Sequence, residues 1–113
     1  MFSFFKKKKT VAHIKLNGVI GNAGKFKQGI DFAGQEELIK KAFSLKKASC
    51  VAITINSPGG SPVQSHMIYS FIRQEAKNSK KKVIVFAEDV AASGGYLISC
   101  AGDEIYANSS SII

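Results

Sequence analysis

Alternation of short apolar runs with stretches of helical periodicity constrains the fold of this chain more than any other feature. Residues 11–20, 51–56 and 83–87 are apolar and β-prone, and the run 51–56 is typical of a strand covered on both faces. Between them, apolar residues recur at helical spacing over 35–47 and 62–78. This order favours parallel βαβ units with right-handed crossovers, so the sequence predicts an α/β fold.

Three further segments fit this pattern. Residues 21–34 are rich in Gly, Asn and Lys and are typical of an open loop. A short helix is predicted over 94–100, followed by a strand over 104–107.

The second long helix has a clear start signal. Ser61 suits the N-cap, Pro62 the first helical position, and Gln64 the far end of a Ser-x-x-Gln capping box. The expected buried stripe of this helix is Val63, Met67, Ile68, Phe71 and Ile72.

The positive charge of the chain is concentrated near its start. Of a formal net charge of +8, all lies in residues 1–50, which hold eleven lysines and three acids. We interpret residues 1–10 as a basic tail and 11–113 as part of one domain. The tail is typical of a solvated segment, with weak contact to anionic lipid as the functional alternative. We expect no nucleic-acid partner, because no aromatic-and-basic recognition motif follows. The run consists of Lys6, Lys7, Lys8 and Lys9.

No apolar stretch approaches the roughly 18 residues that a membrane span requires, and the start lacks the apolar core of a signal peptide. The expected location is therefore cytoplasmic or membrane-associated. Cys50 and Cys100 are too few for a disulfide framework and lack metal-ligand spacing. We interpret both as reduced, half-buried apolar residues and expect no metal.

Two glycine turns follow predicted strands, at residues 57–61 and 91–95. In an open α/β sheet, ligands bind beyond the carboxyl ends of the strands. Glycine lets backbone N–H groups approach a ligand closely, and a following helix adds its positive end. The turns therefore suit an oxyanion hole or a phosphate, although the first one lacks the spacing and the lysine of a P-loop.

Ser93 lies in the second turn with only small neighbours, which leaves its hydroxyl unshielded. A serine on a tight strand-to-helix turn is the geometry of a nucleophile elbow. The N–H of Gly94 is one candidate oxyanion donor, and that of Gly59 or Gly60 is the other. The alternative interpretation is a helix N-cap serine among small packing residues.

The two turns together carry a family resemblance. Asn56-Ser57-Pro58-Gly59-Gly60-Ser61, a helix, a strand and then Ala92-Ser93-Gly94-Gly95-Tyr96 resemble the signal peptide peptidase A family, as does the segment 107–113. The resemblance implies a Clp protease and crotonase-like fold, a Ser-Lys dyad with Ser93 as nucleophile, peptide substrates at membranes, homo-oligomeric rings and no cofactor. It also implies that the turn of Gly59 and Gly60, with Gly94, lines the oxyanion hole.

The general base is the missing part of this interpretation. In single-domain family members the lysine lies some tens of residues after the serine, so we expect the chain to be the N-terminal part of a longer domain. We place His13 on the first strand, and His66 is at most a weak candidate beside the cleft. Two alternatives stay open. One is a crotonase-like acyl-CoA enzyme, and the other is a non-catalytic remnant or assembly subunit.

Overall fold

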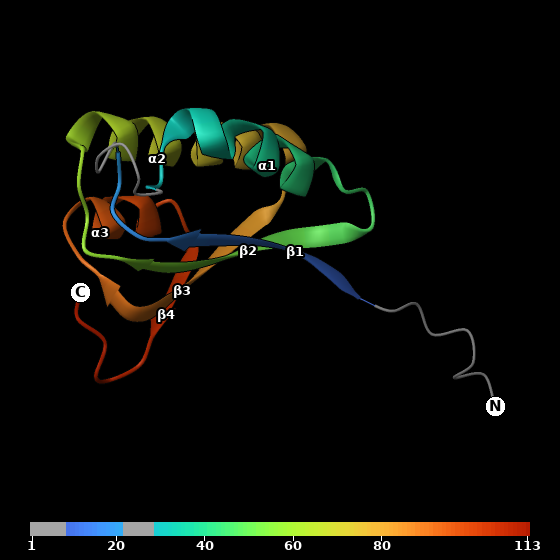
Figure 1. The fold of residues 1–113 in the computed structure, drawn as a ribbon. Helices are drawn as coiled ribbons and strands as arrows, with labels where there is room; N and C mark the ends of the chain where they lie inside the picture. The colour runs from blue at the N-terminus through green and yellow to red at the C-terminus, as the bar shows by residue number, and fades with distance from the viewer. Residues whose placement is uncertain (1–8, 22–28) are drawn as a thin grey trace.

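Four parallel strands form one sheet in the order β1-β2-β3-β4 in the computed structural model, which describes residues 9–21 and 29–113. The three helices lie over one face of this sheet (Figure 1). The elements are β1 (Thr10–Asn17), α1 (Phe32–Ser44), β2 (Ala48–Ser57), α2 (Pro62–Ser79), β3 (Lys82–Ala91), α3 (Gly94–Ser99) and β4 (Glu104–Ala107). The predicted α/β fold of parallel βαβ units is confirmed.

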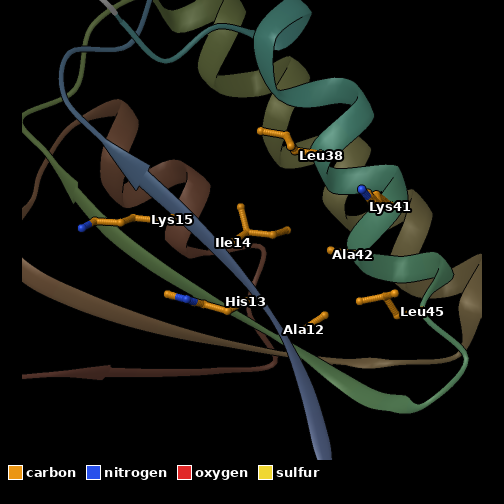
Figure 2. Close-up of a pocket in the computed structure, with 8 residues that line it drawn as sticks. All are labelled: Ala12, His13, Ile14, Lys15, Leu38, Lys41, Ala42 and Leu45. Atoms are coloured by element: carbon orange, nitrogen blue, oxygen red, sulfur yellow. The ribbon is translucent and has the colours of Figure 1, made fainter.

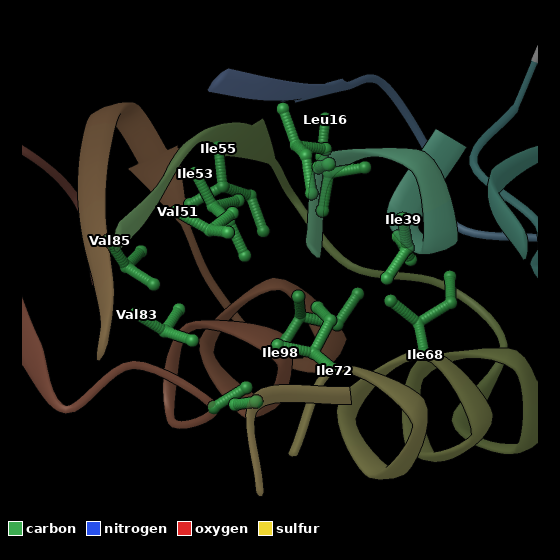
Figure 3. Close-up of a cluster of buried hydrophobic side chains, with 14 of the residues drawn as sticks. Leu16, Ile39, Val51, Ile53, Ile55, Ile68, Ile72, Val83, Val85 and Ile98 are labelled. Atoms are coloured by element: carbon green, nitrogen blue, oxygen red, sulfur yellow. The ribbon is translucent and has the colours of Figure 1, made fainter. Parts of the chain in front are cut away.

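The core lies between the sheet and the helices (Figure 3). Every second residue of a strand points into it, as the two-residue period of a strand requires. On the opposite face His13 is exposed and its Nε2 lies 3.0 Å from Oγ1 of half-buried Thr54. The interpretation of 51–56 as covered on both faces is therefore wrong within the described residues. The fully buried side chains include Leu16, Ile39, Val51, Ile53, Ile55, Ile68, Ile72, Val83, Val85 and Ile98.

The first helix begins three residues earlier than the predicted start at 35. Asp31 is its N-cap, and the carboxylate accepts a hydrogen bond from the N–H of Gly34 at 2.7 Å. This satisfies one of the helix's unpaired donors, so helical geometry starts at Phe32. The helix ends at Ser44, because Leu45 has extended dihedrals. Half of the predicted loop 21–34 lies outside the described residues, as do Lys6, Lys7 and Lys8 of the tail.

The start of α2 is partly as predicted. Oγ of Ser61 accepts from the N–H of Gln64 at 3.2 Å, which confirms the N-cap. The reciprocal half of the capping box is wrong. Gln64 Oε1 accepts instead from the N–H of Phe32 at 2.8 Å, and the N–H of Ser61 donates to the carbonyl of Ile20. Gln64 therefore joins the N-terminal ends of α1 and α2.

The buried face of α2 is also rotated from the predicted stripe. Val63 and Met67 are exposed, at 65% and 40% of their surface. Ile68 and Ile72 of the predicted stripe are buried as expected, and Ser65 and Ala76 are buried with them. Ser65 is buried because α3 packs closely against this side of α2.

The later elements follow the prediction closely. The helix predicted over 94–100 spans Gly94–Ser99, and the strand predicted over 104–107 is β4. Cys100, expected to be half-buried, is exposed, because it follows the last turn of α3. Within the described part of the chain, no helix has both the length and the apolar character needed to cross a membrane.

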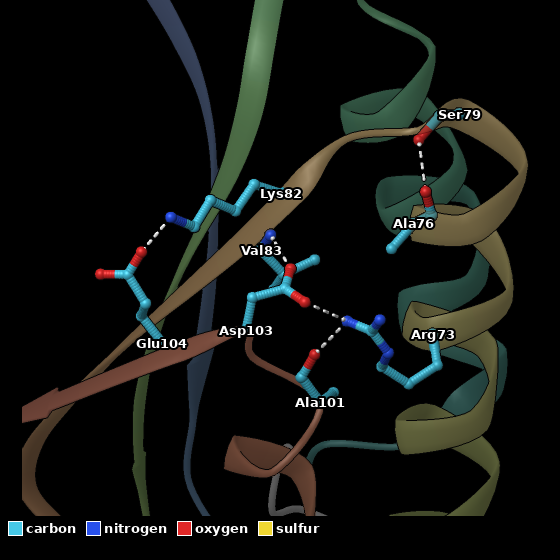
Figure 4. A network of polar contacts seen from close by, with 8 residues as sticks. All are labelled: Arg73, Ala76, Ser79, Lys82, Val83, Ala101, Asp103 and Glu104. Atoms are coloured by element: carbon cyan, nitrogen blue, oxygen red, sulfur yellow. Dashed lines mark hydrogen bonds and ion pairs between the residues drawn. The ribbon is translucent and has the colours of Figure 1, made fainter.

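Ionic contacts join β3, β4 and α2 at the amino-terminal ends of the strands (Figure 4). Lys82 pairs with Glu104, and Arg73 lies 3.4 Å from Asp103. The hydrogen bond from Lys82, helped by one from Tyr106, holds the pKa of Glu104 below its usual range. The same contacts with Glu104 raise the pKa values of Lys82 and Tyr106. These groups are partly or fully exposed, so the ion pairs contribute little to stability and mainly fix how β3, β4 and α2 lie against one another.

Candidate functional site

The two glycine turns meet at the carboxyl-terminal edge of the sheet. Ser57, the last residue of β2, is paired with Ala91, the last residue of β3. Just beyond, the N–H of Ala92 donates to the carbonyl of Ser57 at 3.1 Å. A Cβ atom on Gly59 would lie only 2.7 Å from Cβ of Ser93, so the two turns are in contact. The structure thus brings together Ser93, Gly94 and the turn 57–61, which the sequence singled out separately.

Ser93 has a backbone conformation that side-chain-bearing residues rarely adopt. Its φ is 54° and its ψ is −122°, and its side chain is exposed. Such a conformation is strained for a residue with a Cβ atom. Ser93 stands at the N-cap position of α3, yet its side chain makes no capping hydrogen bond. The hydroxyl is therefore not engaged with the helix, which argues against the capping interpretation.

Glycines after Ser93 allow α3 to pack closely behind it. A Cβ atom on Gly94 would lie 2.2 Å from Oγ of Ser65, on α2. One on Gly95 would lie 2.8 Å from the carbonyl oxygen of Ser57, at the end of β2. Any side chain at these positions would push α3 and the turn that carries Ser93 away from the sheet.

The backbone N–H groups of the turn after β2 differ in whether they are hydrogen-bonded. The N–H of Gly59 donates to Oγ of buried Ser57 at 3.1 Å. The N–H of Gly60 has no hydrogen-bond partner among the described residues, and neither has that of Gly94. Gly60 has a φ of 151° and lies against Ile20, where a Cβ atom would be 2.0 Å from the carbonyl oxygen. The donors available to a ligand are therefore those of Gly60 and Gly94 rather than that of Gly59.

Two positioning residues were not singled out from the sequence. Ser57 binds the Gly59 N–H through its hydroxyl, and Asn56 Oδ1 accepts from the N–H of Val90 at 3.1 Å. The second contact fixes a bulge, because Ile55 pairs with Ala87 whereas Ser57 pairs with Ala91. A serine followed by Pro-Gly is a signal for such a side-chain turn. The bulge, which extends β3 beyond the predicted 83–87, has no comparable signal in the sequence.

Among the described residues, neither the two histidines nor Lys80 to Lys82 form a hydrogen bond with Ser93. His66 is exposed on α2, with its ring 6.4 Å from that of Tyr69. His13 lies on the face of the sheet opposite the helices. Lys80 to Lys82 stand at the amino-terminal end of β3, roughly 30 Å along the strand from Ser93.

Residues near the end of the chain run beside the bulge that leads to Ser93. Oγ of Ser111 donates to the carbonyl of Glu88, and the N–H of Ile112 donates to that of Asp89. The N–H of Ala91 in turn donates to the carbonyl of Ile112 at 2.8 Å. Ile112 is thus paired in parallel with Val90 of β3, one residue before the turn 91–95 that carries Ser93.

Comparison with known proteins finds similarity to a peptidase family, to an antiporter and to several proteases. The sequence profile of peptidase family S49 matches residues 75–113, which include the Ser93 turn. The chain is 52% identical over 101 residues to the Na⁺/H⁺ antiporter NhaA of Brucella melitensis, covering 88% of this chain and 14% of the antiporter. It is 41% identical over 78 residues to Protease 4 of Haemophilus influenzae, covering 66% of this chain and 12% of that protease.

A third relative is a putative signal peptide peptidase SppA of Enterococcus faecium, 30% identical over 105 residues, with 88% of this chain and 30% of the relative covered. The chain therefore spans only 12% to 30% of the lengths of these three relatives. Among solved structures, a ClpP1 mutant from Listeria monocytogenes matches with a TM-score of 0.56 at 23% identity, over 80% of this chain and 46% of that one. This match shows a Clp-like fold.

Proposed function

We propose, because residues 75–113 match the profile of peptidase family S49, that this chain supplies the nucleophile of a serine endopeptidase of the signal peptide peptidase A type. The observation that carries the proposal is Ser93, exposed and strained beside two available backbone N–H groups. A strained residue persists only where its surroundings hold it in place, and such residues cluster at active sites.

The reaction is acyl transfer. Oγ of Ser93 attacks the carbonyl carbon of the scissile peptide bond while a general base takes the hydroxyl proton. The carbonyl oxygen becomes an oxyanion, which the N–H groups of Gly94 and Gly60 stabilise. The carbon–nitrogen bond then breaks, and the amine leaves with the proton from the base. Water next hydrolyses the acyl-enzyme ester and frees Ser93. These steps need no metal or organic cofactor.

The base in this proposal is a lysine, as in the Ser-Lys dyad that the resemblance implies. Lys80, Lys81 and Lys82 lie at the opposite end of β3 from Ser93, so they do not supply it. We therefore place the base on a residue outside the described site. It reaches the Ser93 edge either from another part of the complete protein or from a second copy. The substrates are signal peptides or other membrane-associated peptides, and the working form is a homo-oligomer.

The conformation of the Ser93 turn helps to distinguish the peptidase from a crotonase-like enzyme, but not from a non-catalytic subunit. A crotonase-like enzyme would use the same N–H donors to hold a thioester enolate, but it gains nothing from a strained serine between them. The strain at Ser93 therefore favours the peptidase. A non-catalytic subunit shares the fold and the turns, so activity decides between it and the peptidase.

The test is hydrolysis of an apolar fluorogenic peptide by the complete natural protein. Ser93→Ala should lower kcat by about 10⁴-fold or more, because nucleophile and base act as a unit. Ser44→Ala is the matched control, since Ser44 is an exposed serine at the far end of α1, and it should keep the wild-type rate. An unchanged rate in Ser93→Ala would contradict the proposal. Peptide binding without any turnover in the wild type would favour the non-catalytic subunit.

A further inference from the structure

Lysines precede three of the four strands, and the parallel sheet brings them to one edge. Lys9 comes just before β1, Lys46 and Lys47 just before β2, and Lys80 before β3. Thr10 pairs with Ala48, so Lys9 and Lys47 are level across the sheet. Lys82 pairs with Cys50, and Lys80, two residues before it, is the C-cap of α2 at the same end of the sheet. The lysines thus line up across three neighbouring strands.

The last turns of the helices add to this edge. Lys41 lies in the last turn of α1 and Lys77 in that of α2, and both helices run antiparallel to the strands. These two positions complement the negative ends of the helix dipoles. Lys80 is the C-cap of α2 and shares this role, whereas Lys9, Lys46 and Lys47 lie outside the helices. The lysine edge comprises Lys9, Lys41, Lys46, Lys47, Lys77 and Lys80, all exposed.

The charge of the lysine edge is not neutralised among the described residues. Two acids at this end, Asp103 and Glu104, are already paired with Arg73 and Lys82 (Figure 4). None of the six lysines of the edge forms an ion pair within residues 9–21 and 29–113. Six like charges at one end of a small domain attract an anionic surface over about a Debye length.

Exposed aliphatic side chains are interleaved with these lysines. Leu38 of α1 is 56% exposed, Leu45 just after this helix is 44% exposed, and Val11 of β1 is 50% exposed. The two leucines, with Lys41 and Ala12, line a hollow of about 240 Å³ between α1 and β1 (Figure 2). Lysine beside exposed leucine is typical of surfaces that lie at a membrane interface, where the stem of lysine also contacts apolar groups.

We propose that the lysine edge docks on an anionic lipid bilayer, with the lysines at the headgroups and Leu45 at the acyl boundary. A nucleic acid fits less well. Its recognition favours arginine and stacking aromatic side chains, whereas the edge consists of lysine and aliphatic residues, and Arg73 is paired with Asp103. Exposed leucine gains from contact with hydrocarbon but not from contact with phosphate.

Docking in this way fixes the orientation of the molecule. The lysine edge and Ser93 lie at opposite ends of the strands, roughly 30 Å apart along β3. A chain bound through the edge would therefore hold its Ser93 turn away from the bilayer, facing the aqueous side. This inference concerns a second surface and does not depend on the proposed peptidase activity.

The test is sedimentation of the full chain with vesicles of phosphatidylcholine containing about a third phosphatidylglycerol. We expect binding that is absent with pure phosphatidylcholine and that falls steeply at about 0.5 M NaCl. Lys46→Gln/Lys47→Gln should weaken binding about 30-fold, at about fivefold for each lysine. The matched control, Lys25→Gln/Lys27→Gln, removes the same charge from outside the lysine edge and should stay within about threefold of wild type.

A second pair of measurements separates lipid from nucleic acid. Leu45→Ser keeps every charge and should weaken vesicle binding several-fold, without changing binding of a labelled RNA or DNA oligonucleotide. The proposal is overturned if wild type does not bind the anionic vesicles, or if the edge variant and the matched control bind equally. It is also overturned if removal of residues 1–8 abolishes binding while the edge variant has no effect, or if oligonucleotide binding is tighter than vesicle binding and Leu45→Ser changes neither.

Discussion

Ser93 is held in its unusual conformation by the hydrogen bonds on both sides of it. The N–H of Ala92 binds the carbonyl of Ser57, that of Gly95 binds the carbonyl of Ala92, and that of Leu97 binds the carbonyl of Ser93 itself. A conformation of this kind costs about 1–3 kcal/mol, which these contacts and the packing of α3 offset. A residue without a side chain would adopt it at little cost.

This strain predicts that Ser93→Gly and Ser93→Ala differ in stability. Both remove the hydroxyl, but only glycine relieves the conformation at φ 54°. Allowing for the greater entropy of glycine in the unfolded chain, we expect Ser93→Gly to be about 1 kcal/mol more stable than Ser93→Ala. Urea unfolding followed by circular dichroism measures the difference. Equal stability of the two variants would mean that the turn is not strained.

The sequence singled out Ser93 and the two glycine turns as candidate site residues, but it did not predict how they lie relative to one another. Small residues around Ser93 and glycines at two strand ends are local signals, and both turns lie where the parallel topology puts them. Which glycine has an available N–H depends on Ser57, whose hydroxyl takes that of Gly59. That choice is made by tertiary packing, so the sequence left Gly59 and Gly60 as equal candidates.

At the scale of elements, the helix starts carry the largest differences from the prediction. Gln64 has the spacing of a capping box, yet its side chain reaches across to the N–H of Phe32 on the neighbouring helix. The local partner it would have taken, the N–H of Ser61, is bound by Ile20. Local rules predicted Ser61 as the N-cap of α2 but not Asp31 as that of α1, and a competing long-range contact decided which donor Gln64 binds.

The link between the helices gives a prediction for Gln64. Gln64→Ala leaves the N–H of Phe32 without its acceptor in a half-buried place and should lower the free energy of unfolding by about 1–2 kcal/mol. Gln64→Glu keeps an acceptor and should recover most of this loss. Gln74→Ala, at an exposed position of α2, is the control and should change stability by less than about 0.5 kcal/mol. A loss in the control as large as in Gln64→Ala would contradict the assignment of the effect to this hydrogen bond, because alanine has a higher helix propensity than glutamine.

At the scale of the whole molecule, the two ends of the parallel sheet differ in chemistry. The carboxyl-terminal edge gathers the glycine turns and Ser93, and the amino-terminal edge gathers the lysines. The sequence placed the excess charge in residues 1–50, which is correct as a count. Lys77 and Lys80 belong to the neutral half of the sequence, yet they lie at this edge because α2 ends there. Asp103 and Glu104, two acids at the same end, are paired with Arg73 and Lys82. Only the topology shows that lysines distant in sequence share one surface.

The central claim, that Ser93 is a nucleophile, is tested most directly by covalent labelling of the complete protein with a fluorophosphonate. An activated serine displaces fluoride and retains the phosphonyl group, so mass spectrometry of a digest identifies the modified residue. We predict one adduct, on Ser93, which Ser93→Ala abolishes and Ser44→Ala does not. An adduct on another residue, or labelling of Ser93→Ala at the wild-type rate, would contradict the claim.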